Sequence, residues 1–89
     1  PVIEEFNMDI DNRRIIFSIL VEESNFKKGL YIDHNEDTPR FRTLCSKLNS
    51  DNSCTKKISF PVGSHNLTIK MEDKAGNAAF MDNILFETL

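Results

Sequence analysis

The segment at residues 60–77 constrains this chain more than any other, because it joins a strictly alternating stretch to a turn at each end. Leu67, Ile69 and Met71 alternate with polar residues and therefore share one face of an extended chain. A period of two is typical of a β-strand with one buried face. The segment predicts a strand that packs against a hydrophobic core and is bounded by two turns.

The turn after this strand is predicted from Asp73, Gly76 and Asn77. Glycine and asparagine tolerate the positive φ angles of a tight hairpin. We expect the Asp73 carboxylate to accept hydrogen bonds from the backbone N–H groups of residues 74–76, as in an Asx turn. The alternative is that Asp73 and Asn77 bind calcium, and we favour the turn.

Extended runs separated by turn-forming residues recur along the chain. They are predicted at residues 2–10, 14–23, 29–34, 40–48, 54–60 and 78–89, in addition to the strand within 60–77. Pro61 ends one run because proline cannot donate to a ladder, and the Asp82–Asn83 pair predicts a β-bulge in the last run. About seven short antiparallel strands in roughly 90–100 residues are the pattern of an immunoglobulin-like β-sandwich.

Length and charge restrict the class of protein. A chain of 89 residues makes one domain, at residues 1–89, which buries about 60–65% of its unfolded surface and has a modest core. The net charge of −3, without a basic cluster, argues against a nucleic-acid partner. No apolar run reaches the roughly 20 residues of a membrane span, so we expect no membrane insertion by this segment. Pro1 in place of methionine predicts a domain excised from a longer multi-domain surface protein.

The two cysteines, Cys45 and Cys54, enclose a polar, turn-rich segment between two predicted strands. One interpretation is a disulfide across the mouth of a hairpin, which would stabilise the fold by roughly 2.5–3 kcal/mol and indicates an extracellular setting. The alternative is two reduced thiols, one buried in each strand, in a cytosolic protein. We expect no zinc site, because no Cys-x-x-Cys pair is present and the two histidines are far apart.

Residues 63–69 and 72–77 resemble the penultimate strand and final hairpin of prokaryotic, in particular archaeal, extracellular Ig-like repeats. In that family a Gly-x-His/Tyr-x-Leu-x-Val/Ile strand leads to an Asp-x-x-Gly-Asn turn. Residues 40–45 and Cys54 are similar to a cysteine-bearing version of the repeat, with Phe41 where many relatives carry tryptophan. The resemblance covers roughly residues 28–80. It implies a β-sandwich at the cell surface and a cysteine pair, without one shared activity.

His65 is the first candidate functional residue. It follows a Pro-Val-Gly-Ser corner and lies two residues before Leu67, on the same inward face. A tyrosine-corner side chain takes this place in sandwiches and bonds to backbone upstream, and imidazole can do the same. The alternative is a catalytic base or metal ligand. No serine, cysteine or carboxylate is placed by local spacing to complete a catalytic set, so we favour a structural role.

The loop at residues 33–37 is a second candidate, because Asp33, Asn35 and Asp37 alternate as in the start of an EF-hand calcium loop. Thr38 replaces the glycine at the sixth position and Leu44 replaces the glutamate at the twelfth, which excludes an EF-hand. An irregular calcium or carbohydrate site is the alternative to a solvated acidic loop.

Asn66-Leu67-Thr68 forms a sequon for N-glycosylation. The alternation of the strand predicts that Asn66 points outward, which is the geometry that glycosylation needs.

We expect no enzymatic activity and no cofactor. The chain offers no nucleophile–base pair and no metal set, and its three glycines are assigned to turns rather than to a phosphate-binding loop. The expected function is a structural or adhesive module of an extracellular cell-surface or filament protein, with neighbouring domains or other surface proteins as partners. The alternative is a module that binds carbohydrate or Ca²⁺ through residues 33–37.

Overall fold

The computed structural model describes all 89 residues and contains seven strands and no helix, which confirms the predicted all-β fold. The strands follow the predicted runs closely. They are β1 (Val2–Asp11), β2 (Arg14–Glu22), β3 (Phe26–Asp33), β4 (Arg42–Cys45), β5 (Ser53–Ser59), β6 (Gly63–Asp73) and β7 (Ala78–Thr88).

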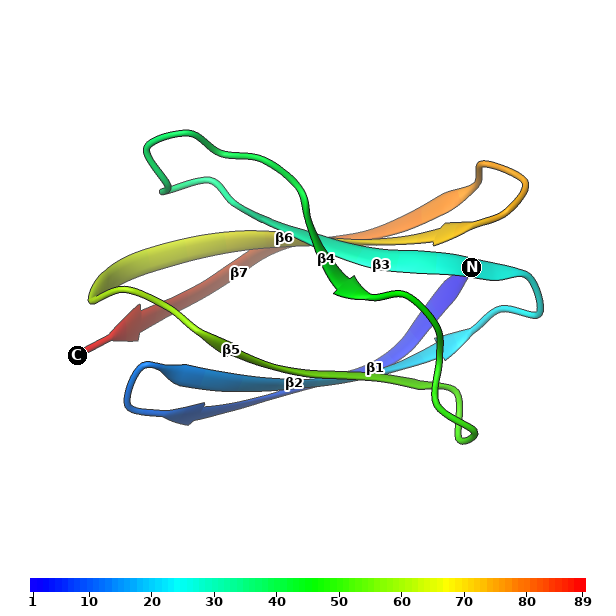
Figure 1. Cartoon of the computed structure of the whole chain (residues 1–89), viewed down its shortest axis with the longest axis horizontal. Coiled ribbons are helices and arrows are strands. Elements are labelled where there is room, and N and C mark those ends of the chain that lie inside the picture. Colours follow the sequence, from blue (N-terminus) through cyan, green and yellow to red (C-terminus); the bar gives the residue numbers. More distant parts are fainter.

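The strands form two antiparallel sheets that stack as two layers (Figure 1). The three-stranded sheet has the order β1-β2-β5, and the four-stranded sheet has the order β4-β3-β6-β7. The chain passes from one sheet to the other after β2, after β4 and after β5. The prediction of an immunoglobulin-like antiparallel sandwich is confirmed.

The core lies between the sheets and is supplied mainly by β2 and β6, whose alternating residues point inward. Each fully buried aliphatic or aromatic side chain contributes about 1.5–3 kcal/mol relative to its exposed state. The twelve core residues are Ile15, Phe17, Ile19, Val21, Leu44, Cys54, Phe60, Leu67, Ile69, Met71, Ile84 and Phe86.

Two predicted strand boundaries are wrong. β3 begins at Phe26 rather than at residue 29, because its pairing with β6 continues past an irregularity to Phe26 opposite Asp73. β4 covers only Arg42–Cys45 rather than residues 40–48, and its register with β3 shifts at Leu44. The bulge predicted in the last strand is confirmed, because residues 82 and 83 of β7 lie opposite a single residue of β6.

Gly29 lies within β3 and not in a turn, which corrects the prediction that all three glycines serve turns. A Cβ atom at this position would lie 2.8 Å from Met71 Sδ and 2.9 Å from Cys45 Sγ. Both distances are shorter than van der Waals contact. Glycine is therefore required because side chains from β4 and β6 fill the space above it.

Substituting Gly29→Ala is expected to lower the free energy of unfolding by about 1–3 kcal/mol, because the added methyl group overpacks the interior. Urea unfolding followed by circular dichroism measures the change. In Gly29→Ala/Met71→Ala the loss should be smaller than the sum of the two single losses, because the shorter residue at position 71 vacates the contested space. Strictly additive losses would contradict this account.

Candidate functional site

His65 is buried on the inward face of β6 and connects three segments of the chain. Its Nδ1–H donates to Asp33 Oδ2 at the end of β3, over 2.6 Å. Its Nε2–H donates to the Pro61 carbonyl oxygen, over 2.9 Å, and Nε2 lies 3.1 Å from Thr88 Oγ1 on β7. His65, Asp33 and Thr88, which we call the histidine cluster, are each at most 5% exposed.

The bond to Pro61 is the upstream backbone contact that the corner motif suggests, but the two side-chain partners were missed. Asp33 and Thr88 lie 32 and 23 residues from His65 in the sequence, so local spacing cannot place them beside it. The one available signal was their position, because each continues the inward-facing alternation at the end of its strand.

The Asp33 carboxylate accepts hydrogen bonds from three donors inside the fold. Burial opposes its ionisation, but hydrogen bonds from His65 and from the backbone N–H groups of Asn35 and Asn66 outweigh burial and lower the pKa of Asp33. The two backbone bonds to Oδ1 measure 3.0 Å and 3.3 Å. Asp33 is only 3% exposed and so is not part of a solvated loop.

The histidine cluster contains the residue types of a nucleophile–base–carboxylate triad, but its protons are arranged differently. A catalytic base must accept the hydroxyl proton at Nε2, whereas Nε2 of His65 faces the carbonyl of Pro61. The Thr88 hydroxyl donates to that same carbonyl and is 1% exposed. These hydrogen bonds join β3, β6 and β7. The geometry therefore suits a structural role for His65 better than a role as a catalytic base.

Aromatic rings enclose the imidazole. The His65 ring lies 5.0 Å from the centroids of both Phe60 and Phe86, and it stacks on Phe86 at an interplanar angle of 28°. These aromatic side chains shield the histidine cluster from water.

The loop at residues 33–37 does not bring its oxygen atoms together. Asp33 points inward, whereas Asn35 and Asp37 are exposed. Asn35 donates through Nδ2 to the Ser64 carbonyl oxygen, and Glu36 accepts a two-point contact from Arg42 at 2.7 Å and 3.3 Å. No group of three or more His, Cys, Asp and Glu side chains is arranged around a common metal position.

Asp73 organises the turn between β6 and β7. Its Oδ1 accepts the N–H groups of Ala75 at 3.0 Å and of Asn77 at 2.8 Å, and its Oδ2 accepts Asn77 Nδ2 at 3.2 Å. The N–H of Asn77 is the main cause that lowers the pKa of Asp73. Of the predicted donors at residues 74–76, only Ala75 contributes. Gly76 has a φ of 91°, so a residue with a side chain would be strained there.

The sequon lies on the outer face of the four-stranded sheet. Asn66 is partly buried there, and its Oδ1 is enclosed without a hydrogen-bond partner. The Thr68 hydroxyl donates to Asp82 Oδ1 over 2.9 Å and lies 2.8 Å from His34 Nε2. The Thr68 side chain is thus buried against its neighbours, whereas Asn66 remains partly exposed on the outer face.

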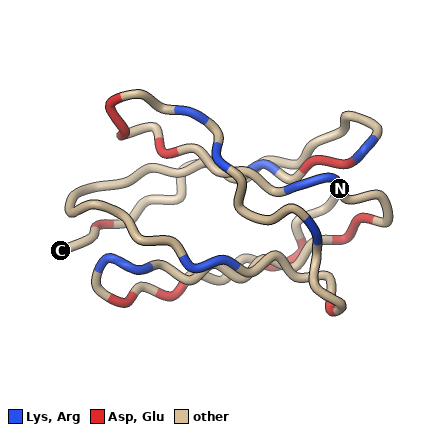
Figure 2. The backbone as a smooth tube through the Cα atoms, in the orientation of Figure 1, with Lys and Arg blue, Asp and Glu red and all other residues tan.

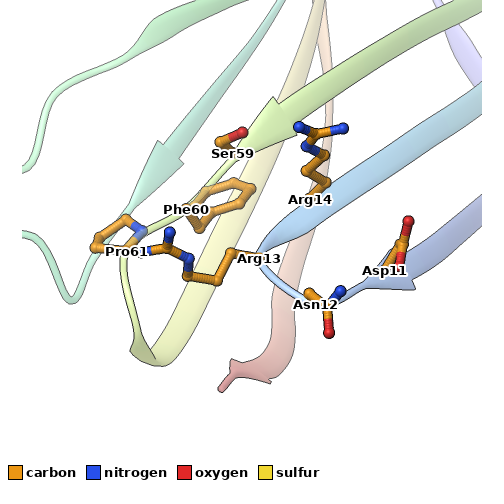
Figure 3. Close-up of a pocket in the computed structure, with 7 residues that line it drawn as sticks. All are labelled: Asp11, Asn12, Arg13, Arg14, Ser59, Phe60 and Pro61. Carbon is orange, nitrogen blue, oxygen red and sulfur yellow. The ribbon is translucent and has the colours of Figure 1, made fainter.

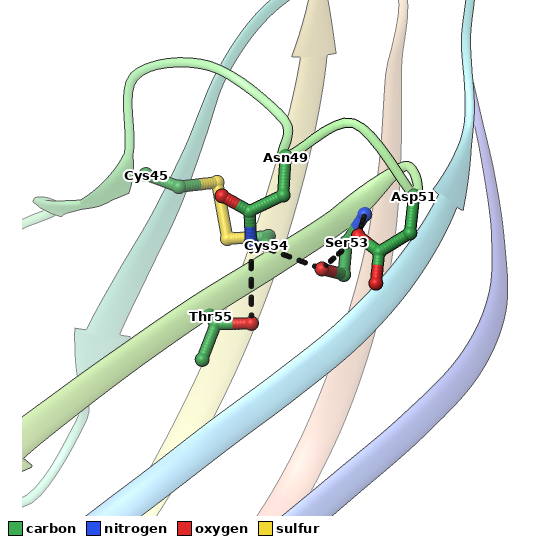
Figure 4. Close-up of a disulfide and its surroundings, with 6 residues drawn as sticks. All are labelled: Cys45, Asn49, Asp51, Ser53, Cys54 and Thr55. Carbon is green, nitrogen blue, oxygen red and sulfur yellow. Dashed lines mark hydrogen bonds between the residues drawn. A yellow bond between two sulfur atoms is a disulfide. The ribbon is translucent and has the colours of Figure 1, made fainter.

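A disulfide joins Cys45 and Cys54, whose Cα atoms are 5.8 Å apart (Figure 4). The predicted bridge is confirmed, but the predicted hairpin is wrong. Cys45 ends β4 of the four-stranded sheet, whereas Cys54 belongs to β5 of the three-stranded sheet. The bond therefore crosses between the layers and fixes two edge strands to each other.

The loop inside the disulfide ring is ordered by its own polar residues (Figure 4). Asn49 Nδ2 donates to Ser53 Oγ over 3.0 Å, and the Ser53 hydroxyl donates to Asp51 Oδ1 over 2.6 Å. The hydrogen bonds from the Ser53 hydroxyl and backbone lower the pKa of Asp51. These short-range contacts hold the chain in position as it crosses between the sheets.

Comparisons with protein-family models, with curated proteins and with solved structures find no match for this chain. The resemblance to extracellular Ig-like repeats stays a prediction from the sequence. No helix in the structure has the length and apolar composition that a membrane-spanning helix requires.

Removing the disulfide, as in Cys45→Ser/Cys54→Ser, is expected to lower the free energy of unfolding by about 2–3 kcal/mol, because the open chain gains entropy when it unfolds. Urea unfolding measures the loss. Reducing the wild-type protein should reproduce it, and reduction of the double variant serves as the control. A reductant effect of equal size in both proteins would contradict the assignment.

Acidification is expected to destabilise the fold as pH falls below about 4, the ordinary range of an aspartate. The folded-state pKa values of Asp33 and Asp73 lie below the ordinary value of 3.8, so their contribution is complete above that pH. It is lost as pH falls through the lower folded-state values, because the unfolded chain binds protons first. Carboxyl ¹³C shifts of Asp33 measured by NMR from pH 2 to 7 test the cause directly. A titration midpoint at or above 3.8 would refute it.

Proposed function

We propose that this chain is a non-catalytic structural or adhesive module of an extracellular cell-surface or filament protein. The observation that carries the proposal is the placement of the two termini. The sandwich measures 38 × 25 × 18 Å, and its first and last residues lie towards opposite ends of the long axis (Figure 1). Chain segments attached before and after it would leave in opposite directions, which suits a unit of a linear array.

The disulfide supports an extracellular setting. Structural disulfides form and persist in oxidising environments and are rare in the cytosol. The Cys45–Cys54 bond also supplements a core of only twelve residues, which is small for a domain exposed to proteases. A covalent link between two edge strands limits the local opening on which proteolysis depends.

The edge strands of both sheets carry features that prevent pairing with other chains. This supports a module that folds separately from its neighbours. Exposed edge strands can pair with other chains unless bulges, short length or inward-pointing charges interrupt them. β1 has an irregularity at Glu4, and β7 has its bulge at residues 82–83. β4 has four residues, and β5 places Lys56 on its inward side, opposite Phe17. Each of the four edges thus carries one of these protective features.

The outer face of the four-stranded sheet supports the adhesive part of the proposal. Phe41, Phe80 and Leu85 are 44%, 57% and 67% exposed. The ammonium group of Lys70 lies 5.6 Å from the Phe41 ring centroid and 5.7 Å from that of Phe80. Exposed apolar surface rimmed by polar groups is typical of contact sites, here with a neighbouring domain or another surface protein.

The location is tested in the cells that make the full-length protein. Antibodies raised against this domain should label intact cells, and permeabilising the cells should add little signal. The control is an antibody against a cytosolic protein, which labels only permeabilised cells. Labelling that depends on permeabilisation would refute the extracellular assignment.

A further inference from the structure

All four arginines of the chain line hollows around Pro61, whereas none of the seven lysines lines these hollows. Three adjoining hollows of about 550, 460 and 250 Å³ meet there, and all three share Pro61 in their lining. Arg13 and Arg14 line the largest, Arg40 and Arg42 line the second, and Arg42 also lines the smallest. We call this region the arginine end.

The largest hollow is formed by the β1–β2 turn, the last residue of β5 and the two residues that follow it (Figure 3). In it, the Arg13 side chain extends towards Pro61, and Arg14 lies beside Ser59 (Figure 3). Backbone joins the two sides of the hollow, because the Phe60 N–H donates to the Arg13 carbonyl oxygen over 2.8 Å. The two side chains can therefore be changed without removing the contact that shapes the site.

Three of these guanidinium groups are free to bind a ligand. Arg42 is paired with Glu36 at 2.7 Å, whereas Arg13, Arg14 and Arg40 are exposed and form no ion pair within 4.0 Å. A guanidinium group is planar and donates two parallel hydrogen bonds, which match a carboxylate. Figure 2 shows the basic residues of the β1–β2 turn at one end of the tube, close to acidic ones.

The other residues that line the largest hollow indicate which uncharged groups the ligand carries in addition to its negative charge. Asp11, Asn12 and Ser59 line it with the two arginines, and its lining contains a single hydrophobic residue. Carboxylate, amide and hydroxyl groups accept and donate hydrogen bonds to hydroxyl-rich molecules. The negative charge of Asp11 also repels a ligand that has a high density of negative charge. The hollow therefore matches a chain of hydroxyl-rich units with widely spaced carboxylates.

Other polymers match the arginine end less well. Single-stranded nucleic acid needs exposed aromatic rings for base stacking, whereas Phe60, the aromatic residue in the lining of the largest hollow, is 6% exposed. An extended peptide that docks through apolar side chains needs hydrophobic pockets, whereas the largest hollow has one hydrophobic residue in its lining and the second has none. We propose that the arginine end binds a polysaccharide that contains uronic acids, with Arg13 and Arg14, whose side chains point in different directions, each holding a different carboxylate (Figure 3). This site is independent of the spacer role.

The test is calorimetric titration of the domain with hexagalacturonate, a uronic-acid oligomer. Binding should occur with the wild-type protein and weaken at least tenfold in Arg13→Gln/Arg14→Gln. The matched control is Lys27→Gln/Lys28→Gln on β3, which removes the same charge at the other end of the sandwich and should change affinity less than twofold. The methyl-esterified oligomer, which keeps the hydroxyl groups and loses the charge, should bind at least tenfold more weakly.

Several results would overturn the proposal. Absence of hexagalacturonate binding, or equal weakening in the arginine and lysine variants, would show that these arginines form no site. Tighter binding of dextran sulfate or of oligothymidylate than of hexagalacturonate would show that the surface responds to charge density instead. Circular dichroism of each variant establishes that its fold is intact, so a loss of binding can be assigned to the side chains.

Discussion

The packing of β2 against β6 across the space between the sheets is the interaction on which the rest of this domain depends. Both strands are flanked by pairing partners, and both point alternating apolar side chains inward, at residues 15–21 of β2 and residues 67–71 of β6. Because the hydrophobic contribution scales with buried apolar area, these two strands supply the largest share of the driving force. The outer strands are added to this central pair and cover its flanks.

Hydrogen bonds and a disulfide join the strands where apolar packing ends. At the end of the sandwich that contains Thr88, the histidine cluster joins β3, β6 and β7 through buried hydrogen bonds. Towards the opposite end, the Cys45–Cys54 bond joins β4 to β5. A buried charge is tolerated only when it is paired and hydrogen-bonded, and Asp33 meets both conditions. These hydrogen bonds and the disulfide hold the strands together at the ends of the small core. Their strength depends on bond geometry, whereas that of apolar packing depends on the buried area.

The sequence predicts the layers well because alternation encodes which face of a strand is buried. The burial of Ile69 and of its neighbours on β6 can be predicted without knowledge of the partner strands, since a period of two is a property of the local sequence. The same holds for the Asp73 turn, whose donors lie within four residues. These parts of the fold can therefore be predicted from short stretches of the sequence.

Features that require the relative placement of distant strands could not be predicted. The pairing of His65 with Asp33 depends on the register between β3 and β6. The cysteines suggested a hairpin because a short loop usually joins neighbours in one sheet, whereas here the loop changes sheets. Gly29 is required by atoms from two other strands. In each case the information lies in tertiary contacts that local spacing does not contain.

The opposite placement of the termini has a mechanical consequence. A pull on both ends acts along β1 and β7, which belong to different sheets, so tension must pass through the core between them. Inter-strand hydrogen bonds run perpendicular to the strands and therefore share such a load instead of breaking one at a time. If the sheets separate, the residues between Cys45 and Cys54 remain looped and cannot extend. The bond thus shortens the reach of the unfolded module and keeps β4 and β5 together as a point from which it can refold.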